Sequence, residues 1–180
     1  MPLGYSTPYN AAVAADLSIV IVSWNVKDLL ARCLASVYRG ADGLAVEVVV
    51  VDNASADGSA AMVSRDFPQA HLIVNPANRG FTAATNRGLR RATGRHWLLL
   101  NPDTEVLEDA LGQMVAYMEA HPQVGVVGPQ LLNPDGSVQS SRRRFPTLGT
   151  ALVESTILQR YFPRARALRR YYCLDQSDAE

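Results

Sequence analysis

The sequence predicts an α/β protein built on a mostly parallel sheet with helices on both faces. Short apolar runs rich in β-branched residues alternate with segments of helical spacing. The run Val46–Val51 is almost wholly apolar, as expected of a strand that is buried on both faces. Strands that alternate with helices are typical of parallel sheets, so the order of the segments and the character of this run indicate the same fold class.

The individual elements follow from local signals. The apolar run 17–23 predicts the first strand. Asn25 is placed to cap a helix that reaches Arg39 and stops at Gly40, with Asp28 completing a partial capping box. Similar reasoning predicts strands at 46–51, 71–74, 96–100 and 124–127, helices at 59–66, 82–92, 107–118 and 147–162, and a hairpin about the turn Asn133–Gly136. The strand 96–100 is expected to be buried, with Trp97 in the core.

Composition excludes several classes of protein. The chain has 180 residues, enough for one ordinary domain, and its 17 basic and 17 acidic residues balance, so no nucleic-acid-binding surface is indicated. Its two cysteines form no zinc or disulfide pattern. With no signal peptide and no apolar run long enough for a bilayer, we expect a cytoplasmic protein.

One segment is strongly basic. Between Arg142 and Tyr172 there are eight arginines and a single acid, Glu154. A solvated charged face is one interpretation. The other is a peripheral contact with anionic lipid headgroups or a lipid-linked acceptor at the inner face of the cell membrane, helped by four aromatic residues, Tyr161, Phe162, Tyr171 and Tyr172.

Polar residues follow three of the predicted strands. These clusters are Ser23-Trp24-Asn25, Asp52-Asn53 and Asn101-Pro102-Asp103. Because parallel strands end at one edge of a sheet, we expect the three clusters to meet in one crevice. For any single cluster, a turn or a helix cap is as good an explanation as a ligand site. Together they favour a ligand site, with Asp103 the leading candidate for a metal-binding or catalytic residue.

Familiar nucleotide-binding loops are absent. The chain has no GxGxxG turn after its first strand, no GxxxxGK[ST] loop and no GxSxG elbow. These absences disfavour a dinucleotide dehydrogenase, a P-loop phosphotransferase and an α/β-hydrolase. If a nucleotide binds, side chains and a metal must hold its phosphates.

An ordered set of motifs resembles family 2 glycosyltransferases, and most closely the bacterial rhamnosyltransferase-like branch. The likeness covers roughly 17–146 and rests on Ile19–Asn25, Val51–Ser59, Asn78–Phe81, Asn86–Gly88, Leu100–Thr104, Val127–Pro129, Pro134–Gly136 and Arg143–Pro146. The resemblance implies an A-type glycosyltransferase fold. It also implies a nucleotide-sugar-binding domain over 16–146. Composition and spacing indicate a lead-in without clear periodicity over 1–15 and a basic helical segment over 147–180.

The resemblance also assigns roles to residues. Asp52 would accept a hydrogen bond from the base of a UDP- or dTDP-linked sugar. Asn101 and Asp103 occupy the family's DxD position, so Asp103 would be the main protein ligand to Mg²⁺ or Mn²⁺. Such a metal stabilises charge on the leaving diphosphate and needs only one or two carboxylates. The remaining nucleotide-sugar-binding candidates are Ser23, Asn25, Asn53, Asn78, Gly80, Asn86 and Asn101.

The activity implied is transfer of a sugar, with inversion, to the hydroxyl of a saccharide or lipid-linked saccharide in cell-surface polysaccharide synthesis. Inverting enzymes need a general base, and no residue of this chain matches the position of the family's base, so the later acceptor-side strands are expected to be missing. An exposed sheet edge or a homo-oligomer would follow. The alternatives are a nucleotide-sugar-binding module or subunit without activity of its own and, less favoured, a nucleotidyltransferase.

Overall fold

A computed structural model describes residues 15–154, 158–161 and 166–173. The chain divides into two compact units between Val127 and Gly128, whereas the sequence places a boundary at 146/147. Nearly all of the predicted lead-in lies outside the described residues. Ala15, its last residue, is buried, and its carbonyl accepts a hydrogen bond from the Arg95 amide.

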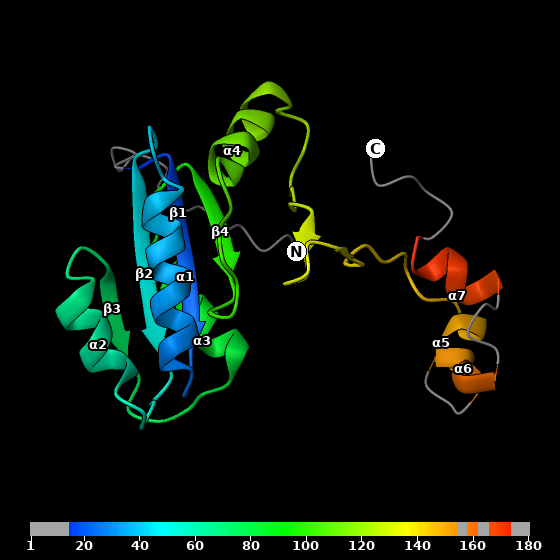
Figure 1. The fold of residues 1–180 in the computed structure, drawn as a ribbon, viewed down its shortest axis with the longest axis horizontal. Coiled ribbons are helices and arrows are strands. Elements are labelled where there is room, and N and C mark those ends of the chain that lie inside the picture. The colour runs from blue at the N-terminus through cyan, green and yellow to red at the C-terminus, as the bar shows by residue number, and fades with distance from the viewer. Residues whose placement is uncertain (1–14, 155–157, 162–165, 174–180) are drawn as a thin grey trace, which may run out of the picture. The chain divides into compact units, whose positions relative to one another are not determined.

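The first unit is built on a four-stranded parallel sheet with the order β3-β2-β1-β4. Its central strand β1 (Leu17–Ser23) pairs with β2 (Val46–Asp52) on one side and β4 (His96–Leu100) on the other, while β3 (His71–Val74) pairs with the far side of β2. The strands point the same way, so their carboxyl ends share one edge of the sheet (Figure 1). The predicted parallel α/β architecture is therefore confirmed.

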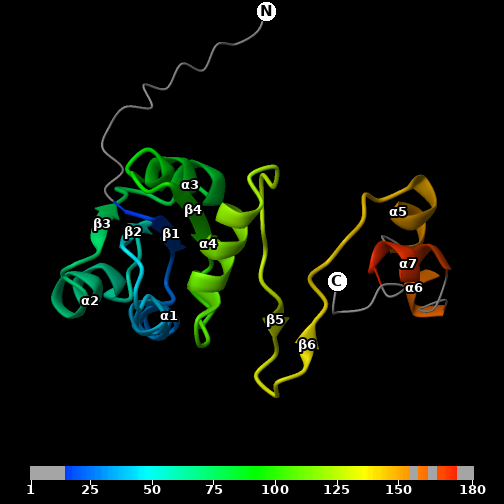
Figure 2. The same cartoon turned by 90° about the horizontal axis from the view of Figure 1, so that it is seen from above.

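Helices cover both faces of this sheet, as the end-on view shows (Figure 2). On one face α1 (Lys27–Arg39), α2 (Ser59–Asp66) and α4 (Ala110–Ala120) enclose the larger core, which includes Ile19, Ile21 and Leu34. On the other face α3 (Phe81–Leu89) packs on Val20, Val49 and Val51. Gly88 makes that packing possible, because a side chain there would collide with Val20.

The edge strand β4 is less buried than the sequence predicts. Trp97 and Leu99 are 58% and 52% exposed, so the expectation of a fully buried strand with Trp97 in the core is wrong. Those residues lie in register with Ser18 and Val20, on the face that carries α3, but they lie outside the core cluster that α3 forms with β1 and β2. No strand in the described part of the chain pairs with the outer edge of β4.

Three other predicted elements differ from the structure. The strand predicted at 124–127 is absent: no neighbouring strand pairs with this segment among the described residues, and Val126 is 89% exposed. Helix α4 begins at Ala110 rather than 107, since Glu108 adopts a left-handed φ of 46° that interrupts a helix. Helix α3 ends at Leu89, three residues before the predicted end.

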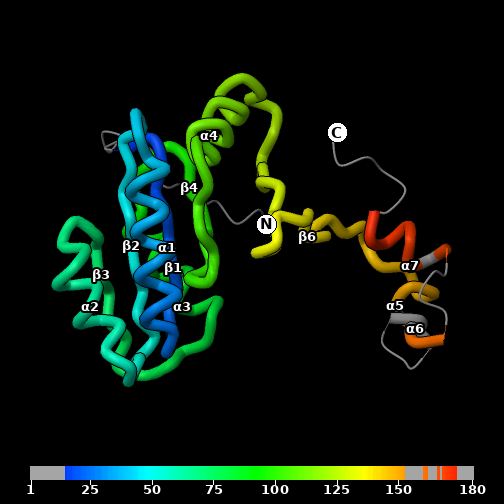
Figure 3. Tube along the Cα trace, in the orientation of Figure 1, coloured from blue at the N-terminus to red at the C-terminus, as the bar shows by residue number. Residues whose placement is uncertain are grey.

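The second unit contains the predicted hairpin and three short helices. Strands β5 (Leu131–Leu132) and β6 (Val138–Gln139) pair antiparallel about the predicted turn. The helix predicted over 147–162 is seen as α5 (Leu148–Glu154) and α6 (Leu158–Tyr161), with 155–157 and Phe162 outside the described residues, and α7 (Arg166–Tyr171) follows (Figure 3). Within the described residues, no helix is both long and apolar enough to cross a bilayer.

Glu47 stabilises the amino-terminal edge of the sheet. Its Oε2 accepts hydrogen bonds from Ser18 Oγ at 2.5 Å and from the Thr93 amide at 2.8 Å. Burial acts to raise the pKa of Glu47, but these hydrogen bonds outweigh burial and the pKa lies below its usual value. The ionised carboxylate therefore joins β1, β2 and the loop that precedes β4.

Replacing this carboxylate should weaken the fold in a pH-dependent way. Glu47→Gln should lower the free energy of unfolding by about 1–3 kcal/mol at pH 7, as expected for hydrogen bonds to a charged group. Because the folded pKa is depressed, the advantage of the wild type should be complete above the unfolded pKa of about 4.5 and vanish as pH falls through the lower folded value.

Urea unfolding at pH 7 and at a series of lower pH values measures this difference. The exposed Glu108→Gln is the matched control and should change stability by less than about 0.5 kcal/mol. A Glu47→Gln deficit that stays constant down to the lowest pH would contradict the account.

Candidate functional site

Two buried side chains with unpaired atoms lie at the ends of β1 and β2. Ser23 and Asp52 are partners in register, so their side chains lie next to each other on the face that carries α1. Asp52 is 1% exposed and its Oδ2 accepts a hydrogen bond from the Ser55 amide at 3.0 Å. Asp52 Oδ1 and Ser23 Oγ have no hydrogen-bond partner within the described structure. Since buried polar atoms are normally paired, these two atoms indicate a place for a ligand.

The loops that follow these strands are fastened to each other. The Asn25 amide donates to Ser55 Oγ at 3.0 Å, and Asn25 Oδ1 accepts from the Ala56 amide at 2.7 Å. Asn25 and Ala54 both adopt left-handed φ angles, 55° and 65°, which turn the chain sharply after each strand. The side chain of Asn25 therefore joins the two loops, a role that its sequence position alone does not reveal.

Asp57 is a site residue that sequence reasoning did not single out. Its Oδ2 accepts from the Lys27 amide at 2.8 Å and so joins the second loop to the start of α1. Its Oδ1 accepts from the backbone and hydroxyl of Ser59. Burial acts against ionisation, but these hydrogen bonds hold the pKa of Asp57 below its usual value. The Asp-Gly-Ser sequence was the available signal, since Asp in such a turn commonly bonds the backbone two residues on.

Asn53 is the centre of a hydrogen-bond network at the end of β2. Its Nδ2 donates to Asn78 Oδ1 at 2.8 Å, and its Oδ1 accepts from Asn75 Nδ2 at 2.9 Å and from the Arg79 amide at 3.1 Å. Its own backbone amide donates to the Ser23 carbonyl at 2.8 Å. Asn53, which is 3% exposed, thus joins the ends of β1, β2 and β3 to the loop before α3.

The start of α3 depends on this network. Asn78 Oδ1 accepts from the Gly80 amide at 2.9 Å as well as from Asn53. Gly80 has φ 77° and ψ 167°, a conformation that is essentially restricted to glycine. A Cβ at Gly80 would meet no atom within 4 Å, so it is the backbone angles that favour glycine here, and the tight backbone approach expected from the sequence stays a prediction. What the helix terminus binds stays a prediction.

Helix α1 holds the turn that follows β4. The Asn101 carbonyl accepts from Thr104 Oγ1 at 2.7 Å and from Cys33 Sγ at 3.6 Å. Burial raises the pKa of the Cys33 thiol to about 11, so the thiol stays protonated and remains a donor. Further along, the Val106 amide donates to Ser36 Oγ at 2.8 Å. The turn is therefore fixed by its backbone, and the side chains of Asn101 and Asp103 are exposed.

Asp103 has the properties required of a ligand to a hard cation. Among the residues that the structure describes, its carboxylate has no hydrogen-bond partner, and no group of three or more His, Cys, Asp or Glu side chains forms a metal site. A metal bound here would take one carboxylate, with substrate phosphates and water as its other ligands. Mg²⁺ accepts such an arrangement, so the donor set fits the predicted cofactor.

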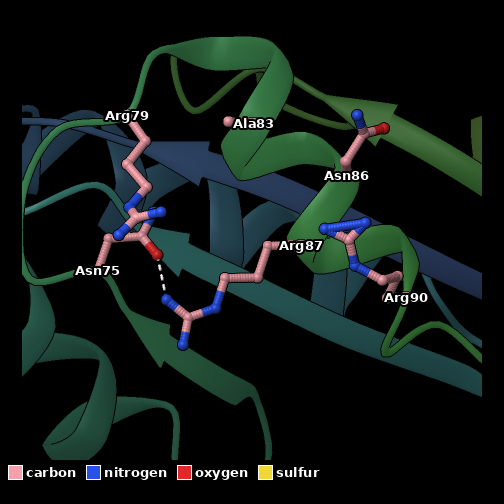
Figure 4. Close-up of a pocket in the computed structure, with 6 residues that line it drawn as sticks. All are labelled: Asn75, Arg79, Ala83, Asn86, Arg87 and Arg90. Atoms are coloured by element: carbon pink, nitrogen blue, oxygen red, sulfur yellow. Dashed lines mark hydrogen bonds between the residues drawn. The ribbon is translucent and has the colours of Figure 1, made fainter.

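Asn86 lies apart from the strand-end residues, on the second turn of α3. It lines a recess of about 500 Å³ together with Ala83, Asn75 and three arginines, Arg79, Arg87 and Arg90 (Figure 4). Sequence reasoning missed Arg87 and Arg90, because only the fold shows that they share this recess with the loop residue Arg79.

The sheet order determines which predicted residues are neighbours. Ser23, Asn25, Asp52 and Asn53 meet at the ends of β1 and β2, and Asn78 and Gly80 join them through Asn53. Asn101 and Asp103 follow β4, on the other side of β1.

Removing the Asn53 side chain should weaken this arrangement. Asn53→Ala leaves the buried Asn75 amide and the Arg79 backbone without their partners, so we expect a loss of about 1–3 kcal/mol in unfolding free energy. Hydrogen exchange of the Arg79 amide should also accelerate.

Asn86→Ala is the matched control, since Asn86 is exposed and alanine is the better helix former. Denaturant unfolding and amide exchange followed by NMR make both measurements. Unchanged Arg79 exchange in Asn53→Ala would refute the assignment of the network.

Comparison with known proteins agrees with this fold. Residues 18–175 match the family described as Glycosyl transferase family 2. The structure is similar to a mannosyltransferase from Pyrobaculum calidifontis solved in complex with GDP-Man and Mn2+, with a TM-score of 0.58 and 28% identity over 72% of this chain and 40% of that one. S. aureus TarS has the same fold, with a TM-score of 0.52 and 23% identity over 59% of this chain and 33% of that one.

Curated relatives include enzymes and pathway proteins of bacterial glycan synthesis. The succinoglycan biosynthesis protein ExoO of Rhizobium meliloti is 33% identical over 81% of this chain and 44% of its own length. An N-acetylglucosaminyl-diphospho-decaprenol L-rhamnosyltransferase of Mycobacterium tuberculosis is 29% identical over 73% of this chain and 46% of its own length. The chain thus spans about half the length of these relatives. Because the family match covers most of the sequence, the chain belongs to glycosyl transferase family 2, a family of enzymes.

Proposed function

We propose that this chain binds the donor for transfer of a sugar, with inversion, from a nucleotide diphosphate to a hydroxyl acceptor in cell-surface polysaccharide synthesis. One observation carries the proposal. Strands β2 and β4 flank β1. β2 ends in Asp52, a buried carboxylate with an unpaired oxygen, and the turn after β4 presents Asp103, an exposed carboxylate with no described partner.

Asp52 is suited to recognise the base. Its unpaired Oδ1 would accept a hydrogen bond from the N–H of a uracil or thymine, which satisfies a buried acceptor that otherwise costs free energy. Because Oδ1 is buried, the fastened loops that contain Asn25 and Ser55 must move apart for the base to enter. Trp24, which is 54% exposed beside them, offers an aromatic surface for stacking.

The spacing of the strands suits a nucleoside diphosphate. Two strand separations lie between the ends of β2 and β4, roughly 10 Å. A base at Asp52 and a diphosphate at Asp103 would span this distance. A divalent cation, Mg²⁺ or Mn²⁺, would neutralise the charge that builds on the departing diphosphate. The similarity to a mannosyltransferase solved with Mn2+ supports this choice of cofactor.

Removing the Asp103 carboxylate should abolish the metal dependence of nucleotide binding. Calorimetric titration with UDP, dTDP and GDP should show that Mn²⁺ strengthens binding of the preferred nucleotide. Asp103→Ala should weaken the Mn²⁺-dependent affinity by about 10- to 100-fold, the range for loss of a charge-assisted contact.

Asp42→Ala removes another exposed carboxylate, in the loop after α1, and should bind nucleotide like the wild type. Nucleotide affinity that does not change with Mn²⁺, or equal affinity in Asp103→Ala and the wild type, would contradict the assignment of Asp103 as the metal ligand.

A second candidate function shares this site. The chain spans less than half of the two curated relatives described above, and no residue is assigned as the general base. A nucleotide-sugar-binding subunit that needs a partner chain for transfer would bind donor in the same way. Release of nucleotide from a bound donor upon addition of a saccharide or lipid-linked acceptor distinguishes the enzyme from the binding subunit.

We further propose that the basic segment Arg142–Tyr172 contacts the inner face of the cell membrane, where lipid-linked acceptors lie. In the second unit Phe145 and Leu148 are 99% and 93% exposed, close in sequence to arginines 142–144. Apolar side chains among arginines are characteristic of segments that bind anionic membrane surfaces. The rhamnosyltransferase relative is named for a decaprenol-linked acceptor, which supports an acceptor of this class.

Vesicle flotation tests this contact. The protein should float with vesicles that contain anionic phosphatidylglycerol and not with neutral phosphatidylcholine vesicles. Phe145→Ser combined with Leu148→Ser should reduce flotation by at least about tenfold, since each buried apolar side chain contributes about 1.5–3 kcal/mol.

The control for this double variant is Val126→Ser, which removes another exposed apolar side chain, in the first unit, and should float like the wild type. Equal flotation of the double variant and the control would contradict the proposal, as would failure of the wild type to bind.

A further inference from the structure

The recess beside α3 is strongly basic. Three arginines contribute to its lining, together with two asparagines and one alanine, and no carboxylate does. Arg79 enters from the loop before α3, Arg87 extends from the helix, and Arg90 directly follows its last residue (Figure 4). Three guanidinium groups around one recess repel each other, so an anion placed among them would relieve that repulsion.

One of the three arginines is fixed in place by buried groups. The Arg87 guanidinium donates to Asn75 Oδ1 and, at 3.4 Å, to the Val74 carbonyl. Asn75 is 2% exposed and is itself bonded to Asn53 at 2.9 Å. The recess therefore has a wall that is connected to the network at the end of β2, which distinguishes it from a set of solvated surface arginines.

The other two arginines keep their side chains available. Arg79 is positioned through its backbone amide, which donates to Asn53 Oδ1, and its guanidinium has no partner within the described structure. The same holds for the guanidinium of Arg90 among those residues. Arginine presents paired donors that match phosphate oxygens, so these groups suit a phosphate better than any uncharged ligand.

The recess is separated from the proposed metal position. Asn75 follows β3 and Asp103 follows β4, and these strands lie at opposite edges of the sheet. Three strand separations, roughly 14 Å, lie between the ends of β3 and β4, whereas the α3 residues of the recess belong to a helix that packs over β1 and β2. A donor with its base at Asp52, whose carbonyl accepts from the Asn75 amide at 2.8 Å, would begin next to the recess and extend from there toward its diphosphate at Asp103, beyond β4.

We propose that this recess binds the phosphate or diphosphate group of a second ligand, distinct from the diphosphate of the donor. That this ligand differs from the donor rests on the proposed function, which places the donor diphosphate at Asp103. The binding of a diphosphate by Arg79 and Arg90 does not rest on it. The group is supplied either by a free phosphate compound or by a lipid-linked diphosphate, and the same arginines would recognise both.

Titration with inorganic pyrophosphate in the presence of EDTA tests the site without a metal. The wild type should bind pyrophosphate with an affinity that falls as salt rises. The double variant Arg79→Gln/Arg90→Gln should bind at least about tenfold more weakly. Arg39→Gln/Arg65→Gln removes two exposed arginines elsewhere and should bind like the wild type. Circular dichroism establishes that both variants fold.

Two further binding measurements identify the source of the phosphate group and test this proposal independently of the proposed function. Farnesyl diphosphate that binds more tightly than pyrophosphate, and is lost in the same variant, indicates a lipid-linked source, whereas equal affinities indicate a free one. UDP with Mn²⁺ should bind the Arg79→Gln/Arg90→Gln variant normally and should not displace pyrophosphate from the wild type.

Three results would overturn the proposal. Absence of pyrophosphate binding by the wild type removes the site. Equal loss of binding in both double variants reduces it to nonspecific charge. Displacement of pyrophosphate by UDP and Mn²⁺ makes the recess part of the donor site. Failure of Asp103→Ala to alter nucleotide binding would instead contradict the proposed function without affecting the proposal that the recess binds a diphosphate.

Discussion

The side chain of Asn53 is the constraint on which the geometry of the site depends. It is buried, and its two polar atoms are used by Asn75, Asn78 and the Arg79 backbone. Its backbone amide reaches the Ser23 carbonyl. The amide side chain, which can both donate and accept, therefore joins the ends of β2 and β3 to the loop before α3, and the backbone amide of the same residue adds the end of β1. Neither a carboxylate nor an apolar side chain of the same size can make this set of bonds.

A division of roles follows from this constraint. Residues that position the loops have their polar groups occupied by protein partners. Asn53 does this directly after β2, Asn25 joins the loops after β1 and β2, and Ser36 of α1 holds the segment after β4. The groups without described partners include Ser23 Oγ, Asp52 Oδ1, the Asp103 carboxylate and the Arg79 and Arg90 guanidiniums. A frame of paired residues that presents unpaired groups suits a binding site, but the two loops joined by Asn25 must part before a base reaches Asp52 Oδ1.

The fold was predictable where burial dominates. Val48–Val51 is buried on both faces of the sheet, and an uninterrupted β-branched run has few other stable settings. The polar residues after β1, β2 and β4 were also predictable as neighbours, because parallel strands end at a common edge. The partial exposure of β4 was not predictable, since its apolar sequence resembles that of a central strand. Whether a neighbouring strand or helix covers Trp97 and Leu99 depends on tertiary contacts that a local pattern does not contain.

The roles of single residues were less predictable than their location. Asn53 and Asn101 both follow strands, yet one is buried in a network and the other is exposed. The arginine recess combines a loop residue with a residue of α3 eight positions further on and the residue after α3, eleven positions further on, a set that only the fold brings together. The left-handed Glu108 that delays α4 has no evident signal in the sequence.

The central claim is that a metal and a nucleoside diphosphate occupy one line across the ends of β4, β1 and β2. Mn²⁺ is paramagnetic, so NMR of the isotopically labelled protein with UDP, dTDP or GDP maps its position directly. The account predicts that nucleotide and Mn²⁺ together broaden the amide signals of 101–104 most strongly and those of 23–25 and 52–55 less, while Ser18 and Glu47 at the opposite edge stay sharp. Broadening centred on Asn75–Arg79, or none at 101–104, would contradict it.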